Sequence, residues 1–157
     1  MVRIPVDINE VFQEILRLTD SELEGIVLRT ELGTDLPQVL ADRVQLQQVL
    51  LNLITNAIDA MKPVADRPHV LSITTKKEKS GGVLVAVADS GVGLGPKKME
   101  ELFDTFYTTK PGGLGLGLSI SRSIIETHGG RLWAERNNGL GAIFLFTLPS
   151  AREGAVK

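Results

Sequence analysis

The chain has 157 residues, a length that suits one domain with a substantial hydrophobic core. Its 17 basic and 19 acidic residues leave a net charge of −2 without a dense basic run, which argues against a dedicated nucleic-acid or anionic-membrane surface. The absence of cysteine excludes disulfides and thiolate chemistry, and two scattered histidines are too few for a zinc site.

The first half of the chain predicts two helices and a strand. Apolar residues recur at helical spacing over residues 8–18, which predicts an amphipathic helix, and alternation over residues 26–32 predicts a strand. Asp42 is a typical N-cap, so a second helix is expected to run from there to about Met61, where Pro63 stops it.

The second half contains 13 of the 16 glycines, between Gly81 and Gly141, and predicts short elements joined by loops. We expect irregular structure at residues 104–114, and helices at residues 96–103 and 116–128. The expected strands cover residues 70–77, 81–89, 131–136 and 142–149, and the last two form a hairpin. These elements predict an α+β two-layer sandwich, with helices over one face of a mixed, largely antiparallel sheet.

The long helix carries an unusual polar stripe. Six side chains fall within about 60° of one line on it: Gln45, Gln48, Asn52, Thr55, Asn56 and Asp59. A solvent-exposed helix face usually carries Lys and Glu, because Asn is a poor helix former. The stripe is therefore either a plain exposed face or a set of amides in a site, where Asn56 offers an oxygen to a hard cation.

Two glycine-rich segments follow, each with two interpretations. In the first, "DSGVGLG", Asp89 ends a strand and can accept a hydrogen bond from an exocyclic amine, or it can simply form an Asp-Ser-Gly turn. In the second, "GGLGLGLS", Leu118 stands where a P-loop has its lysine. Glycines before a helix can bind phosphate through backbone N–H groups, with Lys110 supplying charge, or can serve flexibility and close packing.

The order and spacing of five motifs resemble the catalytic and ATP-binding domain of sensor histidine kinases, in the superfamily of DNA gyrase, Hsp90 and MutL. The motifs are "NLITNAIDAM", "DSGVGLG", "LFDTFYTTK", "GGLGLGLSISRSIIETHGG" and "NNGLGAIFLFTLP". The resemblance covers about residues 2–149. It implies the Bergerat-type ATP-binding fold, a single kinase domain over residues 1–157 with a disordered tail at 150–157, and a dimerisation and phosphoacceptor domain outside the chain.

The resemblance also implies roles for individual residues. Asn56 would coordinate the Mg²⁺ that bridges the phosphates of ATP, with Asn52 in the same polar cluster. Asp89 would bind the adenine amine. The remaining nucleotide contacts would be Gly91 and Gly93 at the base, Lys110, Gly113, Gly115, Gly117 and Leu118 at the phosphates, and Thr147 on the adenine side.

Three departures from the family pattern bear on the chemistry. Asp59 replaces a lysine that often follows the metal-binding asparagine, and Thr105 replaces the proline before the aromatic pair of the third motif. Asn52 stands where hydrolytic relatives carry the glutamate that activates water, and an amide is no general base near neutral pH. The chain is therefore expected to hold ATP without hydrolysing it efficiently.

The expected function is transfer of the γ-phosphate to a histidine on a separate domain, with a response regulator as the indirect partner. His69 and His128 both fit a structural role better than that of the acceptor. Two alternatives from the same superfamily are an anti-sigma-factor-type serine/threonine kinase and a hydrolytic ATP-driven switch. The isolated domain is expected to be monomeric and cytoplasmic, without direct membrane or nucleic-acid contact.

Overall fold

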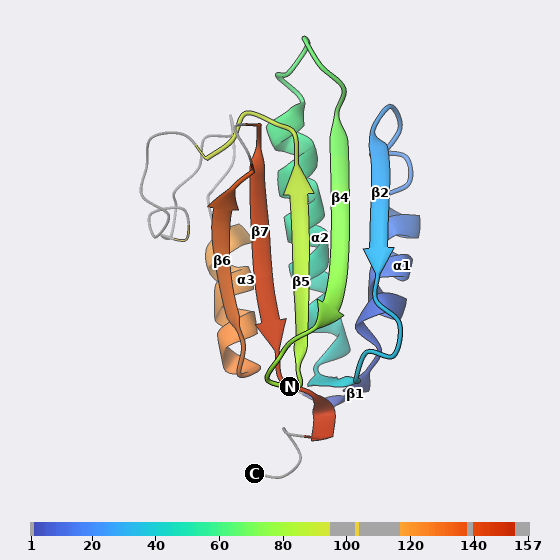
Figure 1. Cartoon of the computed structure of the whole chain (residues 1–157), viewed down its shortest axis with the longest axis vertical. Helices are drawn as coiled ribbons and strands as arrows, with labels where there is room; N and C mark the ends of the chain where they lie inside the picture. The colour runs from blue at the N-terminus through green and yellow to red at the C-terminus, as the bar shows by residue number, and fades with distance from the viewer. Residues whose placement is uncertain (1, 95–102, 104–116, 138–139, 153–157) are drawn as a thin grey trace.

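The computed structural model describes residues 2–94, 103, 117–137 and 140–152, which form two layers (Figure 1). Helices α1 (Ile8–Leu18), α2 (Arg43–Met61) and α3 (Gly117–Thr127) all cover the same face of a sheet, behind it in Figure 1. The sheet has five strands, which in spatial order are β2 (Val27–Leu32), β4 (Val70–Lys77), β5 (Val83–Asp89), β7 (Ala142–Leu148) and β6 (Arg131–Arg136). The predicted α+β sandwich is confirmed.

Strand pairing in this sheet is antiparallel except at one edge. β4 with β5, β5 with β7, and β6 with β7 all run antiparallel, and the last pair is the predicted hairpin. β2 instead pairs in parallel with β4, from Val27 opposite Val70 to Leu32 opposite Thr75. A parallel pair needs a crossover connection, and α2 lies within the segment that joins the two strands.

Helix α2 forms where the sequence predicts it, because its ends are chemically marked. The Asp42 carboxylate accepts a hydrogen bond from Gln45 N at 3.1 Å, and this bond together with one from Val2 N lowers the pKa of Asp42. The helix ends just before Pro63. Strands β1 (Ile4–Val6) and β3 (Val39–Ala41), which pair antiparallel, were not predicted, since three residues are too few to show a periodicity.

The core lies between the helices and the sheet. Along β5 and β7 every second side chain is buried against the helix layer, as alternation in a sheet with one covered face requires. The largest fully buried side chains are Phe12, Phe146, Ile8, Ile15, Leu46, Leu50, Leu53, Ile54, Met61, Leu71, Ile73 and Ile125. The apolar side of α2 supplies five of them, so its polar side is left to face away from the core.

Residues 150–152, the first part of the tail expected to be disordered, are ordered in the structure. Ser150 is buried and pairs with Val39 in an antiparallel bridge, and Ala151 N donates to Gln38 O at 2.7 Å. These bonds extend the ordered chain beyond Pro149 and correct the prediction for residues 150–152. Residues 153–157, most of the predicted helix at residues 96–103, and the irregular segment 104–114 lie outside the described residues.

His128 ties the end of α3 to the beginning of α2. The residue is only 5% exposed, its Nδ1 lies 2.7 Å from Ile124 O, and its Nε2 accepts a hydrogen bond from Asp42 N at 3.1 Å. Because Nε2 accepts from a backbone N–H, Nδ1 is the nitrogen that donates to Ile124 O. This confirms the prediction that His128 is structural.

We expect His128→Ala to lower the free energy of unfolding by about 3 kcal/mol, because it opens a cavity and leaves the partly buried N–H of Asp42 without its acceptor. Urea denaturation measures the loss. Thr127→Ala is the matched control, since Thr127 Oγ1 donates to the same Ile124 carbonyl from an exposed position. Equal losses in the two variants would contradict the role given to the His128 ring.

Candidate functional site

Asp89 is the last residue of the central strand β5, at the end of the sheet where α2 also ends (top of Figure 1). The residue is 2% exposed. Its Oδ1 accepts from Gly91 N at 2.8 Å and from Ala142 N at 3.3 Å, while no described residue donates to Oδ2. Burial raises the pKa of Asp89, and the two backbone hydrogen bonds oppose that shift. Within the described part of the chain, this buried carboxylate therefore has one oxygen engaged and one without a donor.

Two glycines allow the backbone to close around this carboxylate. A Cβ at Gly91 would lie 2.4 Å from Ala60 O, and one at Gly141 would lie 2.0 Å from Asp89 O. Gly141 also has φ +78°, which L side chains rarely adopt. Gly91 therefore lets the loop after β5 approach the end of α2, and Gly141 lets the turn before β7 approach Asp89 itself.

Asn52 connects α2 to the first turn of α3. Its Nδ2 donates to Ser121 Oγ at 3.1 Å and lies 3.3 Å from Gly117 O. Ser121 is completely buried, and Leu118 packs partly buried against the core. The structure thus brings three predicted residues, Asn52, Gly117 and Leu118, to one place, where the polar stripe of α2 meets the beginning of α3.

Asn56 lies one turn beyond Asn52 on the same stripe, a spacing of about 6 Å. It is half-buried, and its amide makes no hydrogen bond to any described residue. The next stripe residue, Asp59, forms an ion pair with Lys62 at 3.1 Å. Asn56 therefore presents an amide oxygen between the α3 contact and the Asp89 end of the sheet.

Thr147 is not at this site, and the expectation that it completes the adenine side is wrong. It pairs with Leu84 and Arg131 near the far end of β7, five residues from Ala142, or about 17 Å along an extended strand. Its neighbours Phe146 and Leu148 are buried against the helices, so its own side chain points to the opposite face. The residue of β7 that contacts Asp89 is Ala142.

The predicted phosphate contacts Lys110, Gly113 and Gly115 lie outside the described residues. Gly93 is described and has φ +83°, with its nearest neighbour 3.5 Å from a Cβ position. Phe103 of the third motif is buried, with its ring edge-to-face on Phe144 at 6.2 Å and Arg122 5.3 Å above it. Phe103, near the beginning of the third motif, is thus anchored on α3 and β7.

Sequence reasoning missed two residues whose side chains bind the backbone carbonyls of Asp89 and the two residues after it. Arg67 donates to the carbonyls of Ser90 and Gly91, and Asn137 Nδ2 donates to Asp89 O at 3.1 Å. These partners come from the loop before β4 and the turn before β7. They carry no local pattern, so only the three-dimensional pairing reveals them.

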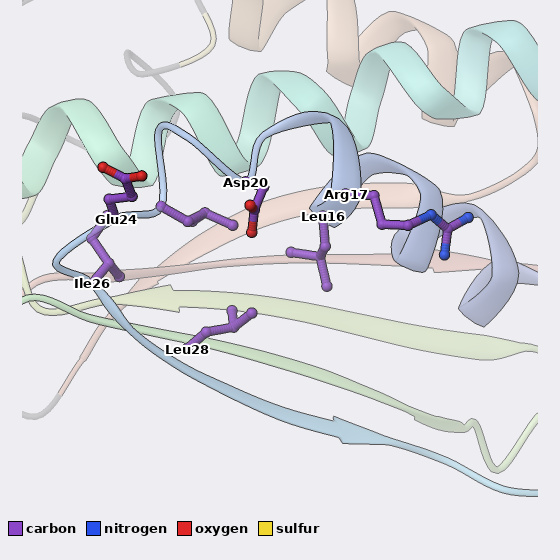
Figure 2. A pocket seen from close by; sticks show the side chains of 7 residues that line it. Leu16, Arg17, Asp20, Glu24, Ile26 and Leu28 are labelled. Atoms are coloured by element: carbon purple, nitrogen blue, oxygen red, sulfur yellow. The ribbon is translucent and has the colours of Figure 1, made fainter.

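A surface hollow of about 410 Å³ lies elsewhere, between the end of α1 and the edge strand β2 (Figure 2). Leu16 and Leu28 face each other across it, with Arg17, Asp20 and Glu24 at its rim. None of the predicted ligand residues lines this hollow, so it is distinct from the Asp89 site.

His69 also has a structural contact. Its Nε2 lies 2.6 Å from Val64 O, within the loop between α2 and β4. With His128 buried between helices, both histidines of the chain have backbone partners, as expected for structural residues. None of the described helices is long and apolar enough to cross a membrane.

Comparison with known proteins gives a consistent result. Residues 41–152 match the family described as histidine kinase-, DNA gyrase B- and HSP90-like ATPases. The chain is 48% identical over 138 residues to the sensor protein FixL of Bradyrhizobium diazoefficiens, covering 88% of this chain and 27% of FixL. It is 37% identical over 146 residues to the sensor histidine kinase ZraS of Salmonella typhimurium, covering 92% of this chain and 30% of ZraS. The chain thus spans less than a third of these relatives.

Solved structures agree with this assignment. The catalytic domain of the histidine kinase ThkA in a nucleotide-free form is 35% identical, with a TM-score of 0.83 over 96% of this chain and 97% of that one. The buried aspartate, the amides of α2 and the five motifs all lie within the matched region. The chain therefore belongs to the family of histidine kinase-, DNA gyrase B- and HSP90-like ATPases, as an ATP-binding catalytic domain of the histidine kinase type.

Proposed function

We propose that the chain binds Mg·ATP and transfers the γ-phosphate to a histidine on a separate dimerisation domain, as the catalytic module of a two-component sensor histidine kinase. The carboxylate of Asp89 carries the proposal. Its Oδ1 is occupied by the N–H groups of Gly91 and Ala142, and its Oδ2, which has no donor among the described residues, is assigned here to a donor from a ligand. The exocyclic amine of adenine is such a donor, whereas the corresponding guanine atom is an acceptor and is repelled.

The phosphate end of the site would lie between α2 and α3. An amide oxygen suits Mg²⁺, and Asn56 has one without a described hydrogen-bond partner. No group of three or more His, Cys, Asp or Glu in the described part of the chain could hold a metal, which fits an ion bound mainly through substrate phosphates and water. When bound, the ion neutralises phosphate charge. Lys110, Gly113 and Gly115 remain predicted phosphate contacts.

In the proposed reaction an imidazole nitrogen of the acceptor attacks the γ-phosphorus. An N–P bond forms, the bond from phosphorus to the bridging oxygen breaks, ADP leaves, and the imidazole proton passes to solvent. This chain's residues bind and orient the nucleotide. Asn52, at the position where hydrolytic relatives activate water, is an amide that donates to Ser121 and has no basic atom. Water attack is therefore expected to be slow.

Solved structures of related kinases support the proposed ligand and partners. ShkA, 30% identical with a TM-score of 0.82, was solved in complex with AMPPNP, and ThkA was solved in complex with the response regulator TrrA. We infer that this domain likewise acts with a dimerisation domain and, indirectly, a response regulator. It would be a cytoplasmic module, monomeric alone, without direct membrane or nucleic-acid contact.

The test is phosphorylation in trans. The chain is mixed with the dimerisation domain of FixL, its 48% identical relative, and with ATP labelled at the γ-phosphate. We expect an acid-labile, alkali-stable phosphohistidine on the acceptor, and little phosphate release when the acceptor is left out. Acid-stable label on a serine or threonine would support the anti-sigma-type alternative, and steady phosphate release without an acceptor would support the hydrolytic switch.

A further inference from the structure

The loop that follows Asp89 accepts two hydrogen bonds from the side chain of one arginine. Arg67 Nε donates to Ser90 O at 3.2 Å, and its NH2 group donates to Gly91 O at 2.8 Å. The guanidinium therefore binds two consecutive carbonyls, a use of its planar fork that a lysine ammonium cannot reproduce. Its side chain is 27% exposed, so these hydrogen bonds are partly shielded from water.

Arg67 and Asp89 hold the same peptide group from its two ends. The peptide between Ser90 and Gly91 offers its C=O to Arg67 Nε and its N–H to Asp89 Oδ1. A charged donor on the carbonyl polarises the peptide and strengthens the hydrogen bond that its N–H donates. The cation therefore acts on the carboxylate through one peptide, although the two side chains do not meet.

The rest of the loop is fixed, so Arg67 determines the orientation of this peptide. Ser90 Oγ accepts from Val70 N at 2.8 Å, and Val92 N donates to Ala60 O at 3.0 Å. Of the described residues, only Arg67 reaches the carbonyls of Ser90 and Gly91 with a side chain. Without it, the peptide can rotate, and Asp89 Oδ1 loses its shorter hydrogen bond, from Gly91 N at 2.8 Å, and keeps only the 3.3 Å bond from Ala142 N to determine which carboxylate oxygen faces a ligand.

We propose that Arg67 is a positioning residue for base recognition: by fixing the Ser90–Gly91 peptide, it holds the Asp89 carboxylate in the orientation that distinguishes adenine from 6-oxopurines. This inference rests on the proposed nucleotide site. It assigns a determinant of base specificity to the loop between α2 and β4, outside the five sequence motifs.

The test is calorimetric titration of the whole chain with ATP and with inosine triphosphate, which carries an oxygen in place of the adenine amine. For Arg67→Met we expect ATP affinity to fall about tenfold, the size of a lost charge-assisted hydrogen bond. Affinity for inosine triphosphate should change less than about twofold, so the preference for ATP shrinks. The ratio of ATP to ADP affinity should stay constant, because it reports on the phosphate end.

Two further variants keep the test decisive. Asp66→Asn removes only the exposed ion pair of Arg67 and should bind ATP like the wild type. Arg67→Lys retains the charge and one donor, so its preference for ATP over inosine triphosphate should lie between those of the wild type and Arg67→Met. This variant tests the proposal if Arg67→Met does not fold. A wild-type chain that binds no nucleotide would contradict the proposed function. Binding by the wild type with an unchanged ATP preference in both Arg67 variants would overturn the role of Arg67 alone.

Discussion

Asp89→Asn is expected to weaken ATP binding by about a hundredfold or more, because the NH₂ group of the asparagine would face the amine of adenine, and both are hydrogen-bond donors. The backbone N–H groups of Gly91 and Ala142 both point at Oδ1 and require an acceptor there. An asparagine must meet them with its oxygen, which turns its NH₂ group toward the ligand and the adenine amine. The same NH₂ suits the oxygen of inosine triphosphate, so the preference between the two nucleotides should reverse.

The same substitution should leave the empty fold intact. Burial raises the pKa of Asp89, so the folded state binds this proton more tightly than the unfolded state does. From the ordinary pKa of aspartate, about 4, up to the raised value, the free energy of unfolding therefore falls as pH rises. Asparagine has no charge to bury. The variant should be at least as stable as the wild type at pH 7 and lose this part of the pH dependence.

Calorimetry with ATP and urea denaturation at pH 4 and pH 7 check both parts. Asp66→Asn is the matched control, because it makes the same chemical change at a side chain that is 83% exposed. If Asp89→Asn bound ATP as tightly as this control, the assignment of Oδ2 to the adenine amine would fail. A large loss of stability at pH 7 would contradict the energetic account of the buried carboxylate.

Gly141→Ala is expected to damage both the fold and the site. The new Cβ would lie 2.0 Å from Asp89 O and 2.7 Å from Asp89 Oδ1, so the backbone at the end of β5 has to move. A non-glycine residue at φ +78° adds conformational strain. We expect the free energy of unfolding to fall by about 3 kcal/mol, the sum of this strain and an overpacking cost.

Gly25→Ala separates the two costs. Gly25 has φ +80°, almost the same conformation, but nothing lies within 4 Å of a Cβ there. It should therefore lose only about 1 kcal/mol, the strain alone. Urea denaturation gives both values, and titration with ATP should show weaker binding for Gly141→Ala only. Equal losses of stability in the two variants would mean that the backbone near Asp89 can move away from the new Cβ without a free-energy cost, and would contradict the overpacking expected there.

Much of the fold was predictable because local patterns determine it. The helix at residues 8–18 and the strand at residues 70–77 have the predicted bounds, since each repeats its apolar residues at one period. The parallel pairing of β2 was not predicted. All but the last of its residues are exposed, so its partner is determined by the crossover through α2 and not by a buried face of its own.

Candidate site residues could be named from the sequence where a motif is contiguous. They were misassigned or missed where it is not. Asp89, Gly91 and the two asparagines could be named as candidates because each stands inside a recognisable segment. Thr147 was assigned to the wrong end of β7, because sequence does not say which end of a strand meets a neighbouring loop. Arg67 was missed because its partners lie more than 20 residues away and are backbone carbonyls, which every residue possesses.

The parallel pair of β2 and β4 constrains the order in which the molecule can assemble. Residue 27 pairs with residue 70, whereas β4 and β5 close over a short loop, and distant contacts cost more chain entropy before they form. On the ribosome, a chain synthesised only as far as the end of α2 holds β2 without its partner. During that interval β2 is an unpaired strand that can pair with another chain and aggregate. The risk is smaller the sooner β4 emerges.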